Sequence, residues 1–238
     1  MPHRASVQPR RALNRIVVSS WIRVTARGLI GLQLVLACLI PQAYDSQRLA
    51  AAAQSLGPRA VAGARSLQQL IANGSQATDD SRVQATNKFF NDAIEFMEDT
   101  DAWGQVDYWA SPLESLNRGA GDCEDYAIAK YFTLVAMGMP TNRLRMVYVR
   151  AQVNGPGTPG LAHMVLAYYP TPGAEPYILD NLVPDVRLAS RRPDLAPVFS
   201  FNTEGLWQGV AGAASGDPTA RLSRWRDLLV KVRAEGFL

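Results

Sequence analysis

Apolar residues repeat at helical spacing through the part of the chain that follows residue 43. From Tyr44 to Asn73 they recur every three or four positions, which predicts a helix that Asn73-Gly74 ends. A second stripe starts after Asp79-Asp80-Ser81 and predicts a core-facing helix that ends within residues 98–101. The aromatic segment 103–109 follows, and two interpretations of it stay open: the wall of a cleft, or core packing.

Apolar and polar positions alternate in the second half of the chain, which predicts strands. The strands are expected at residues 144–153, 162–169, 176–180 and 198–201. Residues 218–238 predict a basic amphipathic helix that packs on the rest of the protein. Because helices precede strands instead of alternating with them, the predicted class is α+β with a mostly antiparallel sheet.

A glycine-led helix start joins the two halves. The glycines of Gly119–Gly121 allow a sharp turn, and the residues after them predict a helix whose first turn contains Cys123. Free backbone N–H groups and the helix dipole at that position favour a thiolate. Three carboxylates, those of Asp122, Glu124 and Asp125, share the turn and oppose thiolate formation because like charges repel. Another group must resolve this conflict.

The first 43 residues differ in composition from the rest. They contain six arginines and no acid, and an apolar run from Gly28 to Ile40 ends just before a small-residue cleavage motif at Ala43. This order is typical of a secretory signal peptide, and an uncleaved membrane anchor is the main alternative. The residues before Cys38 also loosely resemble a lipoprotein cleavage site. Domain organisation is therefore predicted as a signal or anchor, residues 1–43, and one globular domain, residues 44–238.

Charge and residue counts exclude several kinds of site. Without the six N-terminal arginines, the acids outnumber the remaining Lys and Arg, and the chain has no basic stripe interleaved with aromatics, so nucleic-acid binding is not expected. The domain contains one cysteine, Cys123, and one histidine, His163. It cannot form an internal disulfide, and it has too few ligands for a structural zinc site of the Cys/His type.

His163 and Asp180 lie at the outer ends of two predicted neighbouring strands. In a hairpin of 163–169 and 174–180 without a bulge, residue 163 pairs with residue 180, and directly opposed side chains have Cβ atoms about 4.5–5.5 Å apart. Asp180 could then orient the imidazole of His163, which could take the proton of Cys123. The alternative is that Cys123 and His163 are ordinary buried residues.

Several short motifs together resemble the bacterial transglutaminase-like cysteine proteinases of the LapG type. The resemblance extends from Thr86 to Trp207, in the order of that family. Its motifs are Phe89-Phe90-Asn91, Trp103-Gly104, Asp107-Tyr108-Trp109-Ala110, Gly121–Ala127, Ala162–Leu166, Leu179-Asp180-Asn181, Asp194-Leu195 and Phe201-Asn202. The loop 154–160 and the long arginine-rich N-terminal segment depart from the family pattern.

The resemblance implies a periplasmic cysteine endopeptidase with a papain/transglutaminase-like fold. Cys123 matches the family's nucleophile, His163 its base and Asp180 its orienting acid. Asp122 and Glu124, and with less support Asp125, match acidic calcium ligands, and a bound Ca²⁺ would cancel their effect on the thiol.

The resemblance also implies partners for the protease. Its substrate would be a large repeat adhesin, cut near the adhesin N-terminus at an Ala-Ala bond in a Thr-Ala-Ala-Gly-like site. An inner-membrane cyclic-di-GMP receptor would sequester it and so preserve the biofilm. Two other functions stay open: acyl transfer of the transglutaminase type, and calcium-dependent binding without catalysis. A second oxyanion donor beside the N–H of Cys123 is not identified; Trp103, Trp109 and Asn117 are candidates.

Overall fold

The computed structural model describes residues 44–153, 155 and 159–238. The predicted signal segment, residues 1–43, lies outside this range. Within the described ranges, no helix is both long and apolar enough to cross a membrane.

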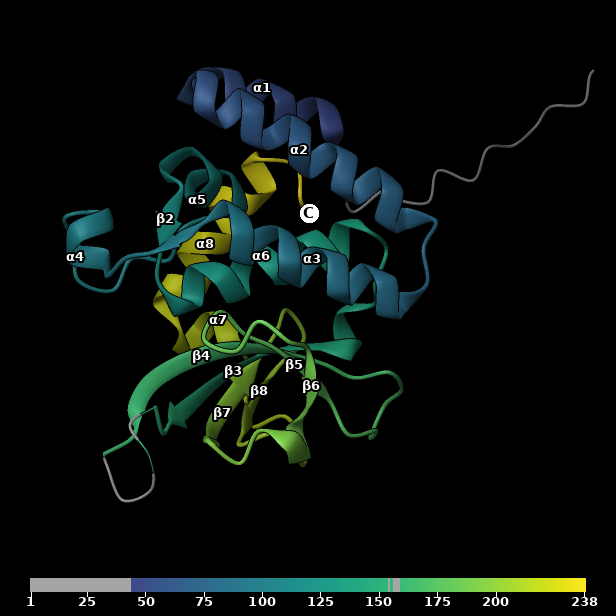
Figure 1. The fold of residues 1–238 in the computed structure, drawn as a ribbon, viewed down its shortest axis with the longest axis vertical. Helices are drawn as coiled ribbons and strands as arrows, with labels where there is room; N and C mark the ends of the chain where they lie inside the picture. The colour runs from purple at the N-terminus through teal and green to yellow at the C-terminus, as the bar shows by residue number, and fades with distance from the viewer. Residues whose placement is uncertain (1–43, 154, 156–158) are drawn as a thin grey trace, which may run out of the picture. The chain divides into compact units, whose positions relative to one another are not determined.

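Helices gather over one side of an antiparallel sheet (Figure 1). The helices are α1 (Ser46–Leu56), α2 (Pro58–Ser75), α3 (Asp79–Ala93), α4 (Asp99–Ala102), α5 (Pro112–Arg118), α6 (Cys123–Ala136), α7 (Pro218–Arg221) and α8 (Ser223–Ala234). The strands are β1 (Glu95–Phe96), β2 (Ala120–Gly121), β3 (Leu144–Ala151), β4 (Leu161–Tyr168), β5 (Tyr177–Leu179), β6 (Arg187–Leu188), β7 (Leu195–Phe201) and β8 (Leu206–Gln208). This arrangement confirms the predicted α+β class.

The main sheet has the order β6-β5-β4-β3-β7-β8, and every neighbouring pair is antiparallel. Side chains alternate between its two faces. Met146, Met164 and Leu166 belong to the large core shared with the helices, whereas Val147 and Val165 belong to a smaller cluster. Helix α6 lies between the sheet and the outer helices, and its side chains from Asp125 to Val135 are all buried.

Four predicted helix boundaries are wrong. The first predicted helix is two helices, because Gly57 adopts a φ of 116° that interrupts the hydrogen-bond ladder and Pro58 then starts α2. Helix α2 also continues through Gly74, which is buried against Met137. The basic C-terminal helix is divided at Leu222, which has an extended backbone.

The fourth wrong boundary matters for function. Helix α3 ends at Ala93, and Ile94 turns into the extended strand β1. That strand pairs in parallel with β2, directly before Cys123: the N–H of Glu95 donates to Gly119 O at 3.0 Å, and the N–H of Met97 to Gly121 O at 3.0 Å. The pairing brings α4 beside the start of α6.

The register of β4 and β5 differs by two residues from the predicted one. Leu166 pairs with Leu179 and Tyr168 with Tyr177. In the predicted register Pro176 would have faced Ala167, but proline has no N–H and cannot extend the ladder. A shift of two residues keeps each side chain on its expected face.

Candidate active site

Helix α6 begins at Cys123. Asp122 is its N-cap residue and has an extended backbone, so the thiol lies in the first turn, as predicted. Gly121 allows the chain to pass close to the carboxylate of Asp125, because a Cβ at that position would lie 2.5 Å from Asp125 Oδ2. The glycine-led turn therefore places one acid beneath the helix start and two others, Asp122 and Glu124, on either side of the thiol.

The thiol of Cys123 has an acidic environment. It donates a hydrogen bond to Glu124 Oε2 at 3.1 Å. Burial, followed by the charges of Glu124 and Asp122, raises the pKa of Cys123, and a hydrogen bond from the N–H of Met164 opposes this shift only in part. Without a compensating positive charge, the thiolate is disfavoured.

His163 and Asp180 form the predicted pair. His163 Nε2 lies 2.8 Å from Asp180 Oδ1, and the two residues are 3% and 1% exposed. Asp180 follows the last residue of β5; continuing the observed register would place it opposite Val165, diagonal to His163 across the strand pair. The two-residue shift therefore preserved the contact although the direct pairing was wrong. Because the carboxylate accepts from Nε2, Nδ1 is the ring nitrogen that remains free to act as a base.

One cavity of about 500 Å³ is lined by Cys123, His163 and Met164 together. Since the Met164 N–H contacts the thiol, Cys123 lies against the residue that follows His163. Among the hydrogen bonds of the described residues, the thiol is bonded to Glu124 and not to His163. Nucleophile and base thus share a cavity, with the thiol turned toward the acids.

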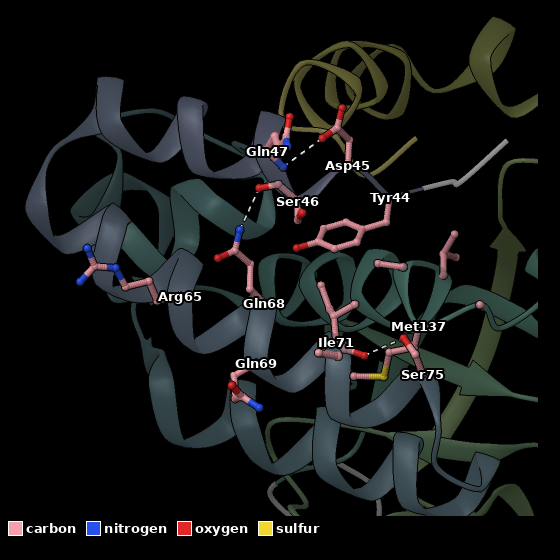
Figure 2. Close-up of a pocket in the computed structure, with 14 residues that line it drawn as sticks. Tyr44, Asp45, Ser46, Gln47, Arg65, Gln68, Gln69, Ile71, Ser75 and Met137 are labelled. Carbon is pink, nitrogen blue, oxygen red and sulfur yellow. Dashed lines mark hydrogen bonds between the residues drawn. The ribbon is translucent and has the colours of Figure 1, made fainter. Parts of the chain in front are cut away.

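A larger cavity, of about 1200 Å³, lies between the start of α1, α2 and the end of α6 (Figure 2). Two of its polar side chains are bonded to nearby backbone: Gln68 Nε2 donates to Ser46 O at 2.8 Å, and Ser75 Oγ to Ile71 O at 2.8 Å. None of the predicted catalytic or metal-binding residues lines it. Its size alone does not make it the reactive site.

Both carboxylate oxygens of Asp180 accept hydrogen bonds. Oδ1 also accepts the N–H of Leu182 at 3.0 Å, and Oδ2 accepts Arg192 Nη2 at 2.7 Å. Burial works against ionisation of Asp180, but the bonds from His163, Leu182 and Arg192 outweigh it and lower the pKa to about 2. Asp180 is therefore an anion that can orient His163 and stabilise its protonated form.

Carboxylates crowd the other side of the thiol. Asp122 and Asp125 can each bring an oxygen within 4.8 Å of one from Asp99, and Glu124 can do so with Asp99 and Asp107. Oδ1 of Asp99 and Oδ1 of Asp122 are buried and accept no hydrogen bond within the described structure. Buried acceptors without donors are costly, and a cluster of them fits a hard cation with oxygen ligands.

The protonation behaviour of the cluster leads to the same inference. Burial and the charge of Glu124 raise the pKa of Asp122 to about 10. Burial raises the pKa of Asp125, and it raises that of Asp99 to about 6 despite a hydrogen bond from the N–H of Tyr108. With only protein groups around them these acids resist ionisation, and a divalent cation would reverse that.

Two candidate oxyanion donors have other partners. The indole Nε1 of Trp103 donates to Asp125 Oδ2 at 3.3 Å, and that of Trp109 to Asp107 Oδ1 at 3.0 Å. Trp103 therefore helps to hold an acid of the cluster. Trp109 lines the cavity, so the aromatic segment forms part of a cleft wall; Asn117 does not line it.

Asp99 and Asp107 were missed in the sequence. Both lie about twenty residues before Cys123 in the chain, and they reach it through the β1–β2 pairing and the loop after α4. Asp107 was already part of a motif shared with the family, and Asp99 belonged to the segment interpreted as a helix end. The position of Asp107 within a family motif, and of Asp99 a few residues before Trp103-Gly104, was the signal in the sequence that could have marked them as candidate metal ligands.

The family comparison decides the identity of the chain. Residues 64–194 match the model of the family described as bacterial transglutaminase-like cysteine proteinase. The chain belongs to this family. No curated protein sequence matches it significantly.

Solved structures of a family member agree with this assignment. Legionella pneumophila LapG in an EGTA-treated form is 38% identical, with a TM-score of 0.69 over 79% of this chain and 97% of that one. A calcium-bound form of the same protein is also 38% identical, with a TM-score of 0.69 and 99% of its chain covered. The protein is thus a LapG-like cysteine peptidase with a transglutaminase-like fold.

Proposed function

We propose that Cys123, His163 and Asp180 are the catalytic triad of this peptidase. The observation that carries the proposal is the buried His163–Asp180 bond, which engages Nε2 of a histidine that lines the same cavity as Cys123. Cys123 is the one cysteine among the described residues, so a cysteine peptidase has no other nucleophile there.

In the proposed mechanism, His163 Nδ1 takes the proton of the Cys123 thiol, and the thiolate attacks a peptide carbonyl. The backbone N–H of Cys123, at the start of α6, stabilises the oxyanion of the tetrahedral intermediate. His163 then protonates the leaving amine, and water hydrolyses the thioester. Asp180 holds the ring orientation and stabilises the imidazolium throughout.

We further propose that the acid cluster of Asp122, Glu124, Asp125 and Asp99 binds Ca²⁺. Its two buried oxygens without donors and its raised pKa values support this assignment. Calcium prefers six to eight oxygen ligands, so backbone carbonyls or waters complete the shell. Bound calcium supplies positive charge beside the thiol, which favours the Cys123 thiolate. LapG of Legionella, which has a calcium-bound form, supports the choice of metal.

The proposed substrate is the N-terminal region of a large surface adhesin, cut in the periplasm at an Ala-Ala bond in a Thr-Ala-Ala-Gly-like site. Four apolar side chains that line the catalytic cavity are strongly exposed: Phe96, Val106, Leu161 and Leu182. An exposed apolar rim is suited to a polypeptide substrate. Control by an inner-membrane cyclic-di-GMP receptor and export through residues 1–43 complete the proposal, on the strength of the family resemblance.

Incubation with an adhesin N-terminal fragment tests the proposal. Wild-type protein with calcium is expected to produce two fragments with new termini at the Ala-Ala bond, whereas C123A and H163A produce none. A fragment with both alanines replaced by bulky residues is the matched substrate control. Cleavage by C123A would refute the nucleophile, and undiminished cleavage after the metal is verifiably removed would refute the calcium role. Cross-linked product without new termini would show acyl transfer instead.

A further inference from the structure

Arg192 connects the candidate triad to the smaller apolar face of the sheet. It follows the short 3₁₀ turn Ala189–Arg191, and only 3% of its surface is exposed. Its Nη2 donates to Asp180 Oδ2 at 2.7 Å, on the opposite carboxylate oxygen from His163. A buried arginine thus faces the orienting acid from the side away from the imidazole.

Asp194 fixes the guanidinium in turn. Arg192 Nε donates to Asp194 Oδ1 at 3.0 Å, and Nη2 donates to Asp194 Oδ2 at 2.7 Å, a planar two-point contact. Backbone bonds hold the same segment, because the N–H of Leu195 donates to Arg192 O and that of Gln152 to Asp194 O. Asp194 and these backbone bonds therefore hold Arg192 in place independently of its contact with Asp180.

We propose that Arg192 is a positioning residue of the catalytic site: anchored by Asp194, it holds Asp180 in the rotamer that orients His163. The inference rests on the triad of the proposed function. Each oxygen of Asp180 has its own donors, so rotation of the carboxylate would break the Arg192 and His163 bonds together. A bidentate arginine fork supplies this rigidity, and a lysine ammonium does not.

Charge balance supports the role. Asp180 and the partly exposed Asp194 carry two negative charges, and Arg192 and a protonated His163 carry two positive ones, so these four side chains together are neutral when the imidazolium forms. Asp194 shares the guanidinium and so prevents it from neutralising Asp180 alone. Lys130, from α6, also faces Asp180 but donates no hydrogen bond within the described residues. Arg192 is the side chain with both the charge and the directed contact.

The chain contains two histidines, His3 and His163, so comparison with H163Q is enough to assign the NMR signals of His163. The Nε2–H proton bonded to Asp180 is expected strongly downfield in the wild type, and its loss in R192Q is the expected result. With the adhesin fragment, R192Q should lower kcat by about 10- to 100-fold, the size seen when the outer hydrogen-bond partner of a metal ligand is lost, and leave KM unchanged. R192K should recover only part of kcat.

The matched control is R143Q. Arg143 pairs with Asp79 at 2.8 Å and contacts Tyr168, at the other end of β4 from His163. This variant should keep the downfield proton and the wild-type kcat at equal folded fraction. In a D180N background, R192Q should cause no further loss of kcat, because Arg192 acts through Asp180.

Retention of the downfield proton in R192Q would overturn the inference, as would an equal loss of kcat in R192Q with and without D180N. If R192Q does not fold, D194N and R192K decide: both folded with wild-type kcat and spectrum would also overturn it. The NMR result needs no substrate. If wild-type protein fails to cut the adhesin fragment, the proposed substrate is wrong and the spectrum still tests Arg192.

Discussion

The carboxylate of Asp180, which is bonded to His163, and the acid cluster beside Cys123 have opposite surroundings. Asp180 accepts hydrogen bonds on both oxygens from His163, Leu182 and Arg192. In the acid cluster, Asp99 and Asp122 each keep a buried oxygen that accepts no hydrogen bond from the described residues. We call Asp180 with its donors His163, Leu182 and Arg192 the completed side, because both carboxylate oxygens accept hydrogen bonds. The acid cluster has more buried acceptor oxygens than donors.

The pKa values express the same difference. Although burial alone would raise the pKa of Asp180, its donors lower it to about 2. Burial and neighbouring acids raise the pKa of Asp122 to about 10. A buried carboxylate is thus stable as an anion only where the fold supplies positive charge or N–H donors. On the Asp122 side, ionisation would require positive charge that the described residues do not supply.

The largest expected effect tests the completed side. D180N removes the carboxylate that orients His163 and stabilises its imidazolium, so kcat should fall by about 10³- to 10⁴-fold. Calcium affinity should stay within about twofold of wild type, because the acid cluster is unchanged. Steady-state kinetics and calorimetric calcium titration measure the two quantities. A calcium affinity that falls in parallel with kcat would show that the two groups are not independent.

A smaller effect is expected from calcium removal, and it depends on pH. The folded-state pKa values of Asp122 and Asp99 are raised, so their contribution to stability is present below the unfolded pKa of about 4 and is lost as pH rises toward the folded value. Chelator-treated protein should therefore lose stability between pH 5 and pH 9. A fixed calcium concentration equal to 100 times the Kd at pH 7 should restore about 2.7 kcal/mol at that pH, more at pH 9 and less at pH 5, because calcium binds the ionised acids.

Thermal unfolding with chelator and with calcium, at several pH values, measures this dependence. D180N serves as the control, since it leaves the cluster intact and should show the same calcium gain. A gain that does not change with pH would contradict the raised pKa values of the acids.

D99N should weaken calcium binding by about tenfold or more, which corresponds to about 1.4 kcal/mol. Asp99 offers one of the two buried oxygens without donors, and the amide removes a negative charge there. Excess calcium should restore the activity of D99N but not that of D180N. D101N is the matched control, because Asp101 lies in the same helix, is exposed and is in none of the groups that could hold a metal. Equal affinity in D99N and D101N would remove Asp99 from the metal site.

Local patterns predicted the residues of the completed side well. The glycine-led turn placed Cys123 at a helix start, and period-two alternation placed His163 and Asp180 on compatible positions. The register was wrong by two residues because the prolines of the connection end the ladder early. Since side-chain direction repeats every two residues, this error did not separate the pair.

Long-range pairing was the part that the sequence did not reveal. Asp99 joins the acid cluster because β1 pairs in parallel with β2, and two-residue strands carry no readable alternation. Arg192 joins Asp180 from a 3₁₀ turn near the sheet edge, where no periodic pattern marks a buried arginine. Both contacts depend on the tertiary fold, which brings together residues far apart in the sequence. The residues around Asp99 and Arg192 have no local pattern that predicts these contacts.

The smallest expected effect concerns Lys130, a fully buried cation near the completed side. Burial lowers its pKa to about 7, although the charge of Asp180 opposes this, and its Nζ donates no hydrogen bond within the described residues. The folded protein therefore binds fewer protons there than the unfolded chain between pH 7 and about 10.4. Below pH 7 the charged amine is buried at full cost, and that cost disappears as pH rises.

K130M should accordingly stabilise the protein by about 1 kcal/mol at pH 6, and by less as the pH approaches 10. Chemical denaturation at both pH values measures the gain. K88M is the matched control: Lys88 is exposed and pairs with Asp92 on the surface of α3, so its loss should change stability by less than about 0.5 kcal/mol. Destabilisation by K130M at pH 6 would show that Lys130 supplies Asp180 with necessary positive charge, and that the completed side needs two cations.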